Sequence, residues 1–173
     1  MSHGLHDLAR HNAWATARVL AYCKDLDEPS LNTTVPGTYG TIISILRHLI
    51  DSEASYVYRL TGAWPQHPWR DDAHIVGLDV LTKRATILAD TLEQFLANDW
   101  DNERLGEARR DNGDVFAVPA GIFITQIIHH ANEHRAQICS ILGASGLDAP
   151  DVSAWDYAWT TGRSTLTSKG ADA

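Results

Sequence analysis

Residues 119–143, PAGIFITQIIHHANEHRAQICSILG, carry the pattern that decides the fold of this chain. Proline at the first turn and glycine at the end are both favoured positions, and they predict a helix from about Pro119 to Leu142. Apolar residues recur along the segment at the spacing of one helix face, which should be buried. The residues on that face are Phe123, Ile127, His130, His134, Ile138 and Ile141. Two imidazoles therefore stand one turn apart within an otherwise apolar stripe.

His130 and His134 need a polar partner on a buried face, because a buried polar group without one costs ~1–3 kcal/mol. A divalent metal would satisfy both imidazoles at once. Catalytic zinc sites usually take three protein ligands and leave a position open for water or substrate. The pair therefore predicts a metal site that needs a further ligand from elsewhere in the chain.

Three more segments show apolar residues at helical spacing, and no convincing β alternation separates them. They are expected as helices at about Leu5–Asp25, Tyr39–Thr61 and Leu78–Ala97. Glu28-Pro29 should end the first helix, and Gly62 with Pro65 should end the second. Residues 99–118 form a long polar connection before the last helix. We therefore expect an all-α fold, a four-helix bundle with a long crossover connection.

Two short elements complete the expected fold. Arg110–Val115 has the composition of a tight turn and predicts a short hairpin within the long connection. A short C-terminal helix is expected at about Val152–Thr161, with Ser153 as its cap. Trp155 and Trp159 lie one turn apart in this helix, and we expect them to close one end of the core.

The size, composition and charge of the chain indicate to which class of protein it belongs. The chain has 173 residues, of which 44% are hydrophobic and 21% charged, the profile of an ordinary globular protein. We expect a single domain over residues 1–165 and a polar C-terminal tail over residues 166–173. The net charge is −8 and the basic residues are scattered, which argues against a nucleic-acid partner. The sequence contains neither an apolar run of ~18 residues nor a signal-peptide pattern, so we expect no membrane partner and a cytoplasmic location.

His48 is the best candidate for the third ligand. Hydroxyl residues stand at helical spacing on both sides of it, namely Thr41, Ser44, Ser52 and Ser55. A row of small hydroxyl side chains can form a cleft wall, but beside a single histidine it is more often a solvated helix face. The pair His130 and His134 on another helix favours the metal site, because three histidines on two helices can converge inside a bundle.

Two acidic residues near His48 have different expected roles. Glu53 falls in the apolar stripe of its helix, about 140° around from His48 at ~100° per residue, and so points to the core. We expect it to be a buried carboxylate paired with a basic group or hydrogen-bonded to another helix. Asp51 could orient the His48 imidazole through its free ring nitrogen, although a solvated aspartate is the usual situation.

The remaining histidines lack ligand spacing within an apolar stripe. They are His3, His6, His11, His67, His74 and His129. His129 shares a polar face with Gln126 and Glu133 and should be exposed. None of the six is therefore assigned to the site.

Several short motifs occur together and in order along the chain. They are Asn12-Ala-Trp14 with Arg18-Val-Leu20, His48-Leu49 with Glu53, and His130-x-x-x-His134-Arg135-x-Gln137. On these motifs the chain resembles the DinB-like superfamily of metalloenzymes, over roughly residues 5 to 143. The resemblance implies a four-helix bundle, often dimeric, with a metal centre formed by His48, His130 and His134. About 30 residues follow the last long helix, so the extra C-terminal domain of some larger relatives is not expected.

The resemblance implies thiol chemistry, and two hypotheses follow. In the first, the protein is a metal-dependent transferase or hydrolase that uses Zn²⁺, or else Ni²⁺, Fe²⁺ or Mn²⁺, with a low-molecular-weight thiol as possible cosubstrate. Its small-molecule substrate would lie near Thr41, Ser44 and Ser52, and no general base is assigned. In the second, the protein is a non-catalytic metal-binding or stress-related helical homodimer. A fourth protein ligand, such as His67 or His74, would favour the second hypothesis.

Overall fold

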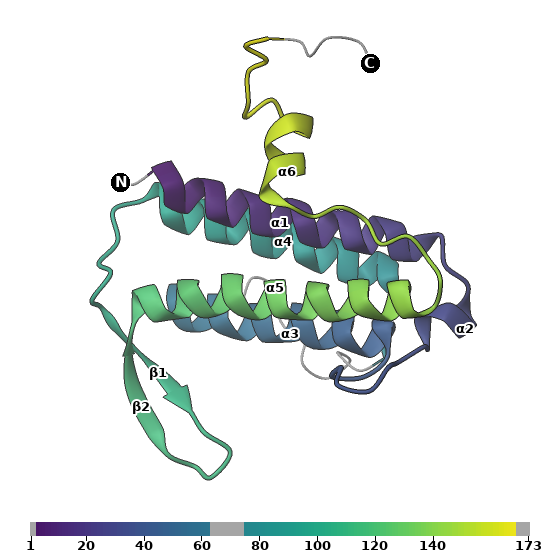
Figure 1. Cartoon of the computed structure of the whole chain (residues 1–173). Helices are drawn as coiled ribbons and strands as arrows, with labels where there is room; N and C mark the ends of the chain where they lie inside the picture. Colours follow the sequence, from purple (N-terminus) through teal and green to yellow (C-terminus); the bar gives the residue numbers. More distant parts are fainter. Residues whose placement is uncertain (1–2, 63–74, 169–173) are drawn as a thin grey trace.

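The chain folds as an all-α bundle of four long helices, as the sequence predicts (Figure 1). The computed structural model describes residues 3–62 and 75–168. The long helices are α1 (His3–Lys24), α3 (Ile42–Thr61), α4 (Leu78–Ala97) and α5 (Ala120–Ala144). The short elements are α2 (Glu28–Leu31), α6 (Ala154–Thr160) and the strands β1 (Leu105–Arg109) and β2 (Val115–Pro119). Three predictions fall outside the described residues. They concern the stop at Pro65, the candidate ligands His67 and His74, and the polar tail over residues 169–173.

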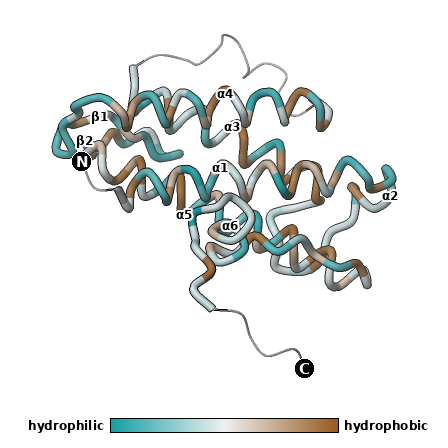
Figure 2. The backbone as a smooth tube through the Cα atoms, turned by 90° about the horizontal axis from the view of Figure 1, so that it is seen from above, coloured by the Kyte–Doolittle hydropathy of each residue, from teal (hydrophilic) through white to brown (hydrophobic). Residues whose placement is uncertain are grey.

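The four long helices pack as two pairs. α1 lies beside α4, and α3 lies beside α5 (Figure 1). Buried aliphatic side chains from all four fill the space between the pairs, among them Val19, Leu20, Leu46, Leu49, Leu88, Leu92, Ile127 and Ile138. Figure 2 shows hydrophobic positions recurring along each long helix, as expected for helices with one buried face. Among the described helices, none has the length and apolarity needed to cross a bilayer.

The beginning of α3 differs from the predicted position. The helix starts at Ile42 rather than near Tyr39, because Thr41 has an extended backbone and caps the first turn. The Oγ1 atom of Thr41 accepts a hydrogen bond from the Ser44 N–H at 3.3 Å. The helix ends as predicted at Gly62, whose φ of 79° is the left-handed conformation that glycine adopts without strain.

Glu28-Pro29 begins a helix instead of ending one. α1 has already ended at Lys24, and the dipeptide forms the first turn of α2. The Asp27 carboxylate caps this turn by accepting a hydrogen bond from the Ser30 N–H at 2.9 Å. Proline suits the first turn because the N–H that it lacks would have no helical partner there.

The long connection before α5 contains the predicted hairpin. β1 and β2 pair antiparallel, with Leu105 opposite Pro119 and Arg109 opposite Val115. The turn falls within Arg110–Val115, as predicted. The hairpin projects from one end of the bundle, and its second strand leads directly into α5 (Figure 1).

The expectation that Trp155 and Trp159 close the core is wrong. Their side chains are 71% and 65% exposed, and their rings stack on each other with centroids 6.3 Å apart. Tyr157 is the buried residue of α6, and its ring packs edge-on against the rings of His11 and Trp14. Trp155 and Trp159 are four residues apart and share one helix face, whereas Tyr157, midway between them, lies on the opposite face. A helix that buries Tyr157 therefore turns both tryptophans outward.

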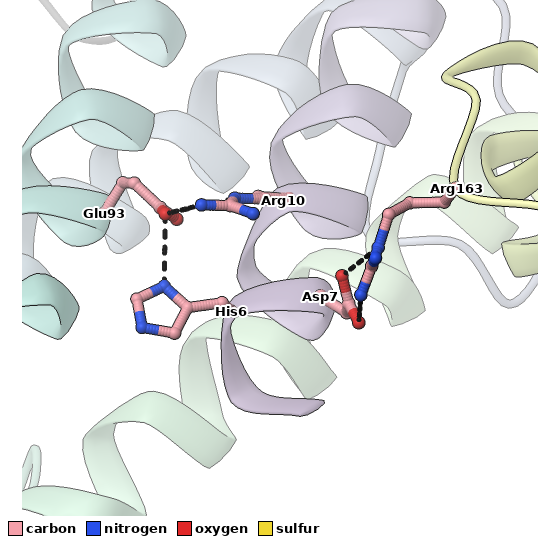
Figure 3. A network of polar contacts seen from close by, with 5 residues as sticks. All are labelled: His6, Asp7, Arg10, Glu93 and Arg163. Carbon is pink, nitrogen blue, oxygen red and sulfur yellow. Dashed lines mark hydrogen bonds and ion pairs between the residues drawn. The ribbon is translucent and has the colours of Figure 1, made fainter. Parts of the chain in front are cut away.

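Ion pairs join the outer surfaces of the elements (Figure 3). Glu93 of α4 accepts a hydrogen bond from Arg10 Nε at 3.0 Å, and its Oε1 lies 3.1 Å from His6 Nδ1. Arg163, which follows α6, donates two hydrogen bonds to Asp7 at 2.8 and 2.6 Å. These contacts tie α1 to α4 and to the segment after α6, and they give His6 a partner away from the predicted metal site.

Candidate metal centre

Two neighbouring helices, α3 and α5, carry the three predicted ligands. His48 lies near the beginning of α3, and His130 and His134 lie in the middle of α5. His130 and His134 are four residues apart, so they project from one face of α5 towards α3. His134 is 5% exposed, whereas the other two are half-buried. The site therefore lies at the boundary between the core and the surface.

The three rings turn the same nitrogen towards one another. The Nε2 atom of His130 lies 3.2 Å from Nε2 of His48 and 3.1 Å from Nε2 of His134. All three potential ligand atoms lie within 4.8 Å of one another. The structure thus brings together His48, His130 and His134, the set that the sequence singled out.

Hydrogen bonds alone do not account for this arrangement. A ring nitrogen of a neutral imidazole either donates or accepts, and it does so in one direction. The Nε2 atom of His130 therefore cannot form good hydrogen bonds with both His48 and His134. A cation between the rings would accept all three lone pairs at once.

The spacing of the nitrogens suits a small divalent cation. A tetrahedral zinc ion with Zn–N bonds of about 2.0–2.1 Å holds its imidazole nitrogens about 3.3–3.4 Å apart. The two separations that involve His130, 3.2 and 3.1 Å, are close to that value, and the nitrogens of His48 and His134 lie within 4.8 Å of each other. Three imidazoles are also a common donor set for zinc and its neighbours in the first transition series. On both counts the residues fit a metal ion.

The surroundings favour the neutral form of His48 and of His130. Burial lowers the pKa of His48, the neighbouring His134 lowers it further, and Asp51 partly opposes both. Burial, followed by the effects of His134, His48 and His129, lowers the pKa of His130 to about 4. Both rings therefore carry a free lone pair at neutral pH, which is the form that binds metals.

Two tyrosines and a glutamine surround the histidines, and sequence reasoning assigned them no role. Tyr39 stacks on His48 with ring centroids 4.1 Å apart and an interplanar angle of 19°. The ring of Tyr56 packs edge-on against His130 at 5.6 Å. Gln137 Oε1 lies 3.2 Å from His134 Nδ1. In the sequence, the position of Gln137 three residues after His134, on the same helix face, could have identified it as a neighbour of that histidine.

The hydroxyl residues around His48 mostly form contacts within α3 or at its N-terminal cap. Thr41 Oγ1 donates to Ser44 Oγ at 3.1 Å, and Ser44 Oγ donates to the Thr41 carbonyl at 2.8 Å. Ser55 is paired with Arg59 one turn later, and Ser52 is half-buried. The capping contacts explain the hydroxyl groups of Thr41 and Ser44 without a ligand.

Glu53 faces away from the histidines, as predicted. It is 7% exposed, and burial raises its pKa to about 7 although the Arg135 guanidinium opposes the shift. Arg135 is 2% exposed and donates hydrogen bonds to Asn12 Oδ1 at 2.8 Å and Thr16 Oγ1 at 2.9 Å. The basic group whose charge acts on Glu53 is therefore Arg135, and the hydrogen bonds of Arg135 join α5 to α1.

The other histidines do not join the cluster in the part of the chain that the structure describes. His129 is exposed, as predicted. His11 Nε2 lies 2.9 Å from the carbonyl oxygen of Val152. His67 and His74, the two candidates for a fourth ligand, lie outside the described residues.

Comparisons with known proteins place the chain in a family. A search of curated proteins found no match. Among solved structures, a DinB-like protein from Bacillus cereus ATCC 10987 is similar, with a TM-score of 0.60 over 83% of this chain and 92% of that chain. Its sequence identity is 18%, so this likeness supports the fold alone. A model of the DinB family matches residues 1–169, a range that includes all three histidines. By this match, the chain belongs to the DinB family.

Proposed function

We propose that the protein is a metal-dependent enzyme of the DinB family in which His48, His130 and His134 hold a divalent cation. The observation that carries the proposal is the convergence of three Nε2 atoms at separations of 3.2 and 3.1 Å that their own hydrogen bonds do not explain. Zinc is the first choice, and nickel, iron or manganese are the alternatives, because three imidazoles suit all of these ions.

The half-buried position of the cluster favours catalysis over a purely structural site. The three ligands that the described residues offer would leave coordination positions for small molecules, whereas a structural zinc site is closed by four. A bound cation would supply a Lewis acid that activates a water or a thiol at neutral pH. The aromatic rings of Tyr39 and Tyr56 would contact the apolar part of a small substrate. We therefore propose thiol transfer to an electrophilic small molecule, or hydrolysis, as the reaction.

Elemental analysis of matched variants tests the ligand assignment. We expect about one ion per chain in the wild type, none in His134→Ala, and full occupancy in His129→Ala. His129 is the matched control, because it is the exposed residue next to His130 in the sequence. Full metal occupancy in His134→Ala would disprove the ligand assignment.

A chelator distinguishes catalysis from a non-catalytic role. The wild type should be screened with low-molecular-weight thiols and electrophilic small molecules, with and without chelator. Loss of turnover on chelation supports the enzyme. If chelation only lowers the melting temperature and no turnover is found, the ion has a structural or storage role.

The proposal includes a homodimer. The stacked pair Trp155 and Trp159 presents a large exposed apolar surface on α6, of the kind that association covers. Light scattering of the wild type and of the double variant Trp155→Ser, Trp159→Ser tests it. A monomeric wild type would contradict the dimer, and a variant that stays dimeric would place its interface elsewhere.

A further inference from the structure

We propose that Gln137 is a positioning residue that fixes the tautomer of His134 and holds Tyr39 over His48. The expected effect of Gln137 on metal affinity rests on the proposed metal centre. The two contacts of Gln137 can be tested separately, in the protein without metal. One side-chain amide would thus orient two of the three proposed ligands.

The contacts of Gln137 identify its oxygen and its role. The backbone N–H of Tyr39 can only donate, and it meets the Oε1 atom of Gln137 at 3.1 Å. The same oxygen lies 3.2 Å from Nδ1 of His134. A carbonyl oxygen can only accept, so Nδ1 of His134 must carry the proton.

This tautomer is the one that a metal centre needs. A neutral imidazole with its proton on Nδ1 has its lone pair on Nε2. Nε2 of His134 is the atom that faces Nε2 of His130 at 3.1 Å. Gln137 therefore turns the lone pair of His134 towards the other two rings, as hydrogen-bond partners of metal ligands commonly do.

The second contact reaches the segment before α3. Tyr39 is 58% exposed, yet its ring stacks on His48 at a centroid distance of 4.1 Å. An exposed ring on an irregular segment needs an anchor to keep such a position. The hydrogen bond from the Tyr39 N–H to Gln137 is that anchor, and it connects α5 to this segment across the cluster.

Three variants separate this role from that of an ordinary surface glutamine. Gln137→Leu keeps the size of the side chain and removes the acceptor. Gln137→Glu keeps an oxygen that can accept both hydrogen bonds. Gln94→Leu makes the same change at an exposed position of α4, away from the cluster.

The first readout needs no metal. Two-dimensional ¹⁵N NMR of the apoprotein reports which nitrogen of His134 carries the proton, and hydrogen exchange reports the protection of the Tyr39 amide. We expect the Nδ1–H tautomer and a protected amide in the wild type, Gln137→Glu and Gln94→Leu. In Gln137→Leu we expect a mixture of tautomers and faster exchange. An unchanged tautomer in Gln137→Leu overturns the proposal.

The second readout is zinc affinity by competition with a chromophoric chelator. We expect the Kd of Gln137→Leu to rise about 10-fold, the lower end of the usual effect of such partners. Gln137→Glu should restore tight binding, and the melting temperature of each apoprotein should stay near that of Gln94→Leu. Equal zinc affinity in Gln137→Leu and the wild type contradicts the positioning role. A wild type that binds no zinc contradicts the metal centre instead, while the NMR result still decides whether Gln137 sets the tautomer.

Discussion

His134 and Arg135 are neighbours in α5, yet they belong to two polar clusters that differ in how they are completed. The histidine cluster consists of His48, His130 and His134. The arginine cluster consists of Arg135, Asn12, Thr16 and Glu53. The first is partly exposed, and its ring nitrogens face one another. The second is buried, and its members bond to or attract one another.

The difference supports the proposal that the histidine cluster, and not the arginine cluster, serves a ligand. In the arginine cluster the guanidinium donates hydrogen bonds to Asn12 and Thr16 of α1 and its charge acts on the Glu53 carboxyl group of α3, so the chain supplies most of its partners. The Nε atom of Arg135 has no hydrogen-bond partner among the described residues. Such a cluster fixes how α1, α3 and α5 pack. In the histidine cluster three ring nitrogens face one another, and the described residues place no cation between them. Under the proposed function, His134 and Arg135 would therefore have a binding role and a structural role on two faces of one helix.

The largest effect is expected when the arginine cluster is broken. Arg135→Leu removes the hydrogen bonds to Asn12 and Thr16 and takes away the positive charge that favours the ionised form of the buried Glu53. We expect a loss of about 3–5 kcal/mol in the free energy of unfolding, measured with urea at pH 8. Arg109→Leu is the matched control, because Arg109 is an exposed arginine of the hairpin. A loss below ~1 kcal/mol for Arg135→Leu would mean that the cluster does not stabilise the packing.

The next effect comes from the metal. Zinc that binds only the folded chain should raise the free energy of unfolding by about 2.7 kcal/mol at a free concentration 100 times the Kd. His134→Ala should lose this increase, whereas its stability without zinc should change less than that of Arg135→Leu. Thermal unfolding with and without zinc measures both quantities. An equal zinc-induced increase in the wild type and His134→Ala would remove the functional distinction between the clusters.

The third effect is the pH dependence that Glu53 contributes. Its pKa is raised from 4.5 to about 7 in the folded chain, so the folded state binds more protons than the unfolded state between these values. Stability from this group is therefore lost as the pH rises from 4.5 to 7. The lowered pKa of His130 gives the opposite slope between about pH 4 and 6.5.

Glu53→Gln isolates the contribution of the carboxyl group, because the histidines are the same in both proteins. The wild type should lose roughly 2 kcal/mol more than Glu53→Gln when the pH is raised from 5 to 8. Urea unfolding at several pH values measures the difference. Parallel pH profiles for the two proteins would show that Glu53 does not hold a raised pKa.

The sequence predicted the parts of both clusters that depend on local periodicity. The four-residue spacing of His130 and His134 fixes a common helix face whatever packs against it. The place of Glu53 in an apolar stripe likewise predicted its burial. The assignment of His48 to the cluster required that α3 pack against α5. Local periodicity does not predict this pairing; only the order of the motifs and the general geometry of helix bundles suggested it.

The sequence could not reveal contacts made by irregular backbone. Tyr39 reaches His48 because Thr41 caps α3 and leaves the preceding residues outside the helix. No periodic pattern encodes that position. The prediction that the tryptophans of α6 close the core was wrong for a related reason. The spacing of Trp155 and Trp159 shows that they share a helix face, but it does not show which face of α6 the bundle covers.

The smallest effect is expected from a third polar cluster, made of the same kinds of residue at the surface. His6, Arg10 and Glu93 combine a histidine, an arginine and an acid, as the two inner clusters do together (Figure 3). Over half of the Arg10 side chain is exposed, so water screens the pair. Glu93→Gln should therefore lower the free energy of unfolding by about 0.5 kcal/mol in dilute buffer and by less in 0.5 M salt. A loss above ~2 kcal/mol in the free energy of unfolding that does not depend on salt would contradict this comparison. Exposed and buried clusters of the same residue types would then contribute equally to stability, and burial would not explain how the clusters differ.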